Sequence, residues 1–124
     1  MPKRRNRIDF NDVRTIALEL PGVEECTTSR GLSLKVRGRL LTCPAIHKSA
    51  EPNSLMVRIS LAERAHLLAD DPDTYYLTDH YSSYPAVLVR LSQISRDSLR
   101  DLLESAARFV SAKTTKGSLK ARRS

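Results

Sequence analysis

The chain of 124 residues contains few glycines and few cysteines, and these shortages exclude several kinds of site. Its four glycines are spread along the chain and leave no glycine-rich loop to hold the phosphates of a nucleotide. Its two cysteines, Cys26 and Cys43, cannot form a zinc site by themselves. Nothing in the sequence places a base beside either thiol, so we interpret both as small, partly buried residues rather than nucleophiles.

Long apolar runs and clustered metal ligands are also missing. No apolar stretch approaches the roughly 18 residues needed to cross a bilayer, so we expect no membrane association. The basic N-terminus lacks the apolar segment of a secretory signal, which indicates a cytoplasmic protein. His47, His66 and His80 are scattered and have no partner at metal-ligand spacing, and we therefore predict no metal and no cofactor.

The net charge of +7 is concentrated at the two ends of the chain. We divide the sequence into a basic N-terminal tail of residues 1–8, one folded domain of residues 9–112, and a basic, disordered C-terminal tail of residues 113–124. The domain holds 12 basic and 14 acidic residues, so it is not itself basic. Such tails can contact phosphate backbones without reading sequence, but they are equally ordinary solubilising ends.

The first half of the domain predicts a helix followed by a β-hairpin. Asp9 can cap a helix whose apolar positions recur at helical spacing until a Pro-Gly pair ends it. Two short strands, residues 31–36 and 39–43, are joined by Arg37-Gly38, where glycine supplies the positive φ of a tight turn. A two-residue turn pairs Leu34 with Leu41 and Leu32 with Cys43, so these four side chains point into the core.

The second half predicts two more strands and two more helices. Residues 55–59 alternate like a half-buried strand, and residues 86–91 form another. Between them, Ser60 and Glu63 form a capping box that opens a helix. Ser95 caps a final helix with an apolar stripe of Leu99, Leu102, Leu103, Ala106 and Val110. Because helices and strands do not alternate regularly, we predict a single α+β domain with a largely antiparallel sheet and helices packed on one face.

Three segments, in this order, resemble a known family. They are residues 20–25 (LPGVEE), residues 34–41 (LKVRGRLL) and the tyrosine-rich residues 75–91. Together they are similar to the MmcQ/YjbR family of small bacterial proteins. The resemblance implies a YjbR-like domain, grouped with CyaY-like (frataxin-like) folds, and it implies DNA binding. The chain departs from the family at Ala86, where members often carry a large aromatic residue after the proline.

Basic residues gather on the sheet face that the alternation of the strands directs away from the helices, and at the hairpin tip. They are Lys35, Arg37, Arg39, Arg58 and Arg90. As nucleic-acid-binding residues they would hold the phosphates of a DNA duplex while the hairpin enters a groove. The alternative is an ordinary solvated face, since antiparallel sheets routinely carry Lys and Arg that prevent edge pairing.

The tyrosine-rich loop suggests a different site, a ligand pocket made by Asp79, His80, Tyr81 and Tyr84, or tyrosines that stack on bases. Neighbouring residues of an extended segment point to opposite sides, so Asp79 and His80 do not form a catalytic dyad on their own. A purely structural alternative is that the tyrosines pack against the sheet edge while Asp79 and His80 fix the loop through hydrogen bonds.

The sequence therefore predicts a monomeric, non-enzymatic protein, because no catalytic constellation is found. Its expected activity is weak, salt-sensitive DNA binding through the basic hairpin and both tails. The alternative is a small-ligand or protein-interaction module that uses the tyrosine-rich loop and has no nucleic-acid role.

Overall fold

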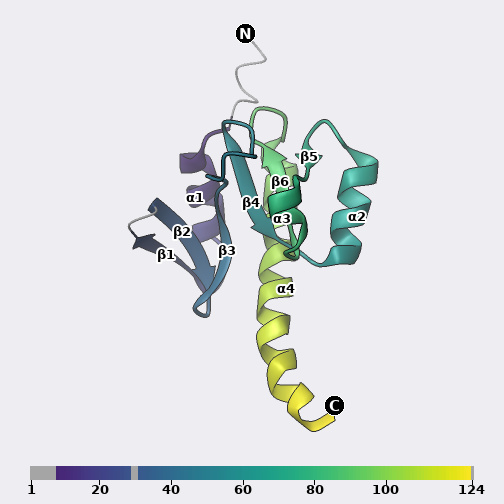
Figure 1. Ribbon diagram of the computed structural model, residues 1–124. Coiled ribbons are helices and arrows are strands. Elements are labelled where there is room, and N and C mark those ends of the chain that lie inside the picture. Colours follow the sequence, from purple (N-terminus) through teal and green to yellow (C-terminus); the bar gives the residue numbers. More distant parts are fainter. Residues whose placement is uncertain (1–7, 29–30, 124) are drawn as a thin grey trace.

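A computed structural model describes residues 8–28 and 31–123, which form one six-stranded sheet with helices packed against it (Figure 1). The strand order is β1-β2-β3-β4-β6-β5, and every neighbouring pair is antiparallel. The predicted α+β class with an antiparallel sheet is confirmed. The basic segment of residues 1–7 lies outside the described residues.

Helices and strands follow one another in mixed order along the described chain. The helices are α1 (Phe10–Leu18), α2 (Leu61–Asp70), α3 (Asp79–Ser82) and α4 (Arg96–Arg123). The strands are β1 (Val23–Thr28), β2 (Gly31–Val36), β3 (Arg39–Pro44), β4 (Ser54–Arg58), β5 (Tyr75–Tyr76) and β6 (Ala86–Arg90).

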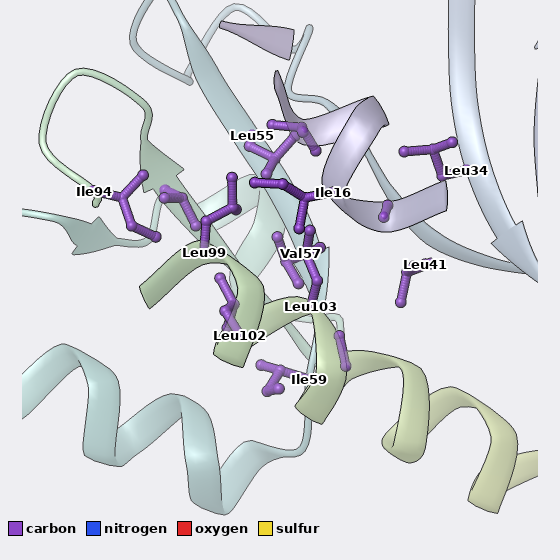
Figure 2. Packing of buried hydrophobic residues seen from close by; sticks show 14 of the residues in the cluster. Ile16, Leu34, Leu41, Leu55, Val57, Ile59, Ile94, Leu99, Leu102 and Leu103 are labelled. Atoms are coloured by element: carbon purple, nitrogen blue, oxygen red, sulfur yellow. The ribbon is translucent and has the colours of Figure 1, made fainter. Parts of the chain in front are cut away.

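The main core lies between one face of the sheet and the helices α1 and α4. Figure 2 shows Ile16 of α1 and Leu103 of α4 directed toward Val57 of β4. The stripe predicted on the last helix is confirmed, since each of its members is buried: Leu99, Leu102, Leu103, Ala106 and Val110. Removing a leucine side chain from water contributes about 1.5–3 kcal/mol, so this stripe fixes α4 across the sheet.

Both ends of the domain differ from the boundaries that we expected. Ile8, placed in the N-terminal tail, is buried in the main core, so the folded domain already includes it. At the other end α4 continues to Arg123, through the segment from Lys113 for which we expected disordered chain. Extending an existing helix needs no new nucleation, and lysine, arginine, alanine and leucine are good helix formers.

Strand β3 contains a bulge that the sequence pattern did not indicate. Val36 pairs with Arg39 and Lys35 with Leu40, but Leu34 then pairs with Thr42, which leaves Leu41 as an extra residue.

Leu41 and Thr42 are both buried, and the Thr42 hydroxyl donates a 2.7 Å hydrogen bond to the backbone carbonyl of Met56. The predicted pairing of Leu34 with Leu41 is therefore wrong, although both side chains are in the core.

Because of the bulge, Cys43 does not point into the main core as predicted. A one-residue shift in a strand moves every following side chain to the opposite face. Cys43 pairs with Met56 and packs in a second, smaller cluster on the other face of the sheet. Leu32 was also expected in the core, but the ladder between β2 and β3 ends at Leu34, and Leu32 is only half-buried.

The second cluster covers part of the face opposite α1 and α4. The single turn of α3, which the sequence pattern did not indicate, places Tyr81 against it, while Leu88 of β6 is fully buried beneath. The predicted helices therefore pack on one face, and α3 together with residues 45–53 forms a low wall on the other. The rest of this second face carries the candidate site.

Candidate functional site

A pocket with a volume of about 890 Å³ lies on the second face of the sheet. Its floor is made by outward-facing side chains of three strands: Lys35, Leu40, Cys43, Met56 and Arg58. Within the floor, Lys35 lies opposite Leu40 on the neighbouring strand, and Cys43 lies opposite Met56. The bulge in β3 is what brings Cys43 into this row.

Two stacked imidazole rings form one wall of the pocket. The rings of His47 and His80 are nearly parallel, with centroids 3.6 Å apart, and the Tyr81 ring meets both edge to face. The Tyr81 hydroxyl accepts a hydrogen bond from the backbone N–H of His47 at 3.2 Å. Tyr81 is buried, so it ties the segment before β4 to α3.

The protonation state of His47 follows from its neighbours. Its Nδ1 accepts a hydrogen bond from the backbone N–H of Ser49 at 3.0 Å, so the neutral ring carries its proton on Nε2. Partial removal from water lowers the pKa of His47 below its ordinary value, and the charges of His80 and Lys48 lower it further. A neutral His47 is therefore favoured when the pocket holds no anion.

Residues 45–53 are held against the sheet by an arginine clamp. Arg90 donates to both carboxylate oxygens of Glu51 at 2.9 and 2.8 Å, and its guanidinium lies 4.3 Å from the centroid of the Tyr76 ring. It also donates to the carbonyls of Pro72 and Asp73. Arg90 was predicted to contact nucleic acid, but these partners occupy its guanidinium, and we assign it a structural role.

A second arginine fixes the connection between α3 and β6. The Nη1 of Arg64 in α2 donates to the carbonyls of Ser82, Tyr84 and Ala86, at 3.3, 2.8 and 3.2 Å. Arg64 thereby sets the path of the chain that carries Tyr84 to the rim of the pocket. The sequence pattern gave no reason to single it out, because it lies in a different element from the residues it holds.

The charges around the pocket have one sign. Lys35, Lys48 and Arg58 line it, whereas no aspartate or glutamate among the described residues does. Arg58 makes only a long hydrogen bond, from Nε to the Pro85 carbonyl at 3.4 Å, and no ion pair with a described residue. The pocket is thus locally cationic in a domain with more acidic than basic residues.

Two separately predicted groups of residues meet in this pocket. Lys35 and Arg58 come from the basic face, and His80, Tyr81 and Tyr84 come from the tyrosine-rich loop.

The other predicted site residues lie outside the pocket. Asp79 is exposed at the start of α3, and Arg37 and Arg39 are exposed at the hairpin tip. The sequence reasoning missed His47, Lys48 and Cys43, whose approach to the site depends on the loop path and the bulge.

The thiol of Cys43 is poorly suited to nucleophilic chemistry. Burial raises its pKa above the ordinary value, so it is protonated at neutral pH. Among residues 8–28 and 31–123, no group of three or more His, Cys, Asp or Glu side chains is placed to hold a metal ion. In that same part of the chain, no helix has the length and apolar character to cross a bilayer.

A solved structure has the same fold. The crystal structure of the Deinococcus radiodurans protein DR2400, a DUF419 domain, superimposes with a TM-score of 0.70 over 88% of this chain and 83% of that one, at 21% identity. DUF419 is the MmcQ/YjbR family, so the fold implied by the three sequence motifs is confirmed. No family model matches the sequence itself.

Curated relatives match only a part of the chain. The uncharacterized proteins Rv2570 of Mycobacterium tuberculosis (strain ATCC 25618 / H37Rv) and Mb2600 of Mycobacterium bovis are each 48% identical to it over 40 residues. The matched region covers 32% of this chain and 31% of each of those proteins. These relatives carry no described activity that bears on the pocket.

Proposed function

We propose that the chain is a non-enzymatic binding protein of the DUF419 (MmcQ/YjbR) family and that its pocket binds a small anionic ligand. One observation carries the proposal: in the part of the chain that the structure describes, three cationic side chains and no carboxylate line the pocket. Lys35 and Arg58 are half-buried and Lys48 is exposed. Like charges that lie close together repel one another unless an anion joins them, so such a lining favours a negatively charged ligand.

The size and the apolar parts of the pocket support a small molecule. Ligand pockets commonly measure about 300–1,000 Å³ and combine apolar walls with a few well-placed polar groups. Here Leu40 and Met56 form the apolar part of the floor, and the imidazole and tyrosine rings add aromatic edges.

The proposal is tested by titrating the full chain with anions in a calorimeter. Arg58→Gln should weaken the binding of any anion that the wild-type protein takes up, by about tenfold for a lost charged hydrogen bond. Arg39→Gln is the matched control, since it removes the same charge from an exposed position outside the pocket. Equal effects of the two substitutions would show general electrostatics and contradict a pocket.

A thiol reporter gives an independent test. In a Cys26→Ser variant, Cys43 is the only thiol and lies in the pocket floor. Bound anion should slow the alkylation of Cys43 by a neutral maleimide. An alkylation rate that does not change at saturating anion would place the anion elsewhere.

DNA binding is the second candidate, favoured by the hairpin tip. Arg37 and Arg39 are exposed there and make no ion pair with a described residue, and Lys35 precedes them on β2. A two-stranded ribbon fits the major groove.

Anisotropy of a labelled duplex against salt tests this candidate in the full chain. Arg37→Ala and Arg39→Ala should each reduce the salt slope by about one. Unchanged slopes in both variants would remove the hairpin from any DNA contact.

A further inference from the structure

We infer that the anion taken up by the pocket is a phosphate monoester joined through a linker to a flat aromatic ring, the chemistry of a nucleoside 5′-monophosphate. This inference rests on the proposed function and names its ligand class. Such a ligand would contact two features of the pocket, the cationic floor and the exposed aromatic rim. An inorganic anion would contact only the first of them.

The floor favours a phosphate over a single carboxylate. A phosphate monoester carries about −1.5 to −2 charges at neutral pH and offers three acceptor oxygens, which suits several cations at once. Lys35 on β2 and Arg58 on β4 supply two of these charges from the floor, and the exposed Lys48 supplies a third from residues 45–53. The planar guanidinium of Arg58 can also donate two parallel hydrogen bonds to phosphate oxygens.

A comparison between two arginines of the same sheet supports the role of Arg58. Arg90 of β6 has a carboxylate, two carbonyls and an aromatic ring as partners. Arg58, at the end of the neighbouring strand β4, has one carbonyl at 3.4 Å. Guanidinium groups that are half-buried are normally paired, so Arg58 is the one placed to receive a ligand oxygen.

The rim favours a flat apolar body on the ligand. Two large side chains at the pocket edge are exposed although one is apolar and the other aromatic: Ile46 at 64% and Tyr84 at 48%. The Tyr84 ring lies edge to face with His80, which is itself stacked on His47. Aromatic ligand rings stack on such surfaces irrespective of their exact substituents.

The closing experiment separates the phosphate from the ring. We would titrate the full chain with adenosine 5′-monophosphate, ribose 5-phosphate, adenosine, inorganic phosphate and benzoate, at one salt concentration. The nucleotide should bind about tenfold more tightly than ribose 5-phosphate, because stacking of one base on an aromatic side chain is of that size. Adenosine should bind more weakly than the nucleotide, because it lacks the phosphate.

Two substitutions assign the two halves of the ligand to residues. Tyr84→Ala should remove the advantage of the nucleotide over ribose 5-phosphate, while Tyr84→Phe retains it. Arg58→Gln should weaken both phosphates to a similar degree and leave adenosine unchanged. Tyr84 is half exposed, so neither of its variants removes core packing, and a melting curve of each protein confirms the fold.

The outcomes distinguish this inference from the proposed function. Equal affinities for the nucleotide and ribose 5-phosphate would show that the aromatic ring of the ligand contributes nothing. That result overturns this inference and leaves the proposed anion binding intact. Binding of benzoate, together with no binding of any phosphate compound, would show that the pocket does not select a phosphate. That result also overturns this inference and leaves the proposed anion binding intact. Binding of no anion overturns both. A single-stranded oligonucleotide that binds more tightly than the mononucleotide, at equal nucleotide concentration, overturns a free nucleotide as the source of this chemistry.

Discussion

The imidazole rings of His47 and His80 stack at 3.6 Å although one ring precedes β4 and the other lies in α3. The stack brings two titratable groups together at the wall of a pocket whose fixed charges are all positive. Protonation of His47 adds positive charge to that wall. Any anion that enters the pocket is therefore expected to bind together with protons.

We predict that anion affinity increases as the pH falls. The pKa of His47 is lowered, first by partial removal from water and then by the charges of His80 and Lys48. A bound anion offsets these charges and raises that pKa toward or beyond the ordinary value of about 6.5, so binding takes up a proton. Sulfate is a suitable test anion because it does not titrate in this range. Calorimetry in two buffers of different ionisation enthalpy measures the proton uptake, and His47→Gln should reduce it.

The same shift predicts a loss of stability in acid without ligand. A lowered pKa means that the unfolded chain takes up the His47 proton before the folded chain does. The contribution of neutral His47 is thus complete above about pH 6.5 and is lost as the pH falls through the lowered value. Urea unfolding at several pH values checks this. His47→Gln should make the curve flatter over that window, and an unchanged curve would contradict the assignment.

Arg90 should contribute more to stability than its ion pair alone. Glu51→Ala removes only the carboxylate, which is the more exposed partner of the pair, and we expect only a small loss of stability. Arg90→Ala also removes the donors to the Pro72 and Asp73 carbonyls, so the loss should reach about 1–3 kcal/mol. Urea unfolding of both single variants and the double variant gives the coupling. Equal losses in the two single variants would show that the backbone contacts contribute nothing.

Arg64→Ala should loosen the connection between α3 and β6. Three carbonyls lose a donor, and the backbone N–H groups of Tyr84 and Ala86 should exchange with solvent faster. The matched control is Arg108→Ala in α4, where the guanidinium donates a 3.3 Å hydrogen bond to the Ser105 hydroxyl. Hydrogen exchange followed by mass spectrometry over residues 82–86 measures the effect. Equal exchange in the two variants would exclude Arg64 as the residue that holds the loop.

Thr42→Val should destabilise the protein by about 1 kcal/mol while keeping the size of the side chain. The buried hydroxyl donates to the Met56 carbonyl at 2.7 Å, next to the bulge in β3. Thr15→Val is the control, because Thr15 also donates to a backbone carbonyl but is exposed on α1. Its effect should remain within about 0.5 kcal/mol. Denaturant unfolding of both variants tests whether burial makes the difference.

Much of the fold could be predicted from local patterns. Asp9 caps α1 with a complete capping box, and Ser60 caps α2 by accepting from the Glu63 N–H. The hairpin turn is at Arg37 and Gly38, both with positive φ. These features depend on residues close in sequence, whose hydrogen bonds form within one turn.

The parts that could not be predicted depend on distant contacts. The bulge at Leu41 allows the two-residue turn and the burial of Thr42 to occur together. The alternation of apolar and polar residues alone does not distinguish a bulged strand from a regular one. The pocket needs the loop that carries His47 to meet the helix that carries His80. Each half was visible as a basic face or a tyrosine-rich loop, but nothing local indicated that the two share one cavity.

Strand β4 serves the core and the pocket with alternate residues. Leu55 and Val57 are buried beneath α1 and α4, whereas Met56 and Arg58 form the pocket floor. The residues of β4 that line the pocket can therefore change during evolution without changing the fold, because adjacent positions of the strand are under different selection. Homologues that recognise other ligands should diverge at every second residue of this strand and exchange only similar apolar residues at the positions between.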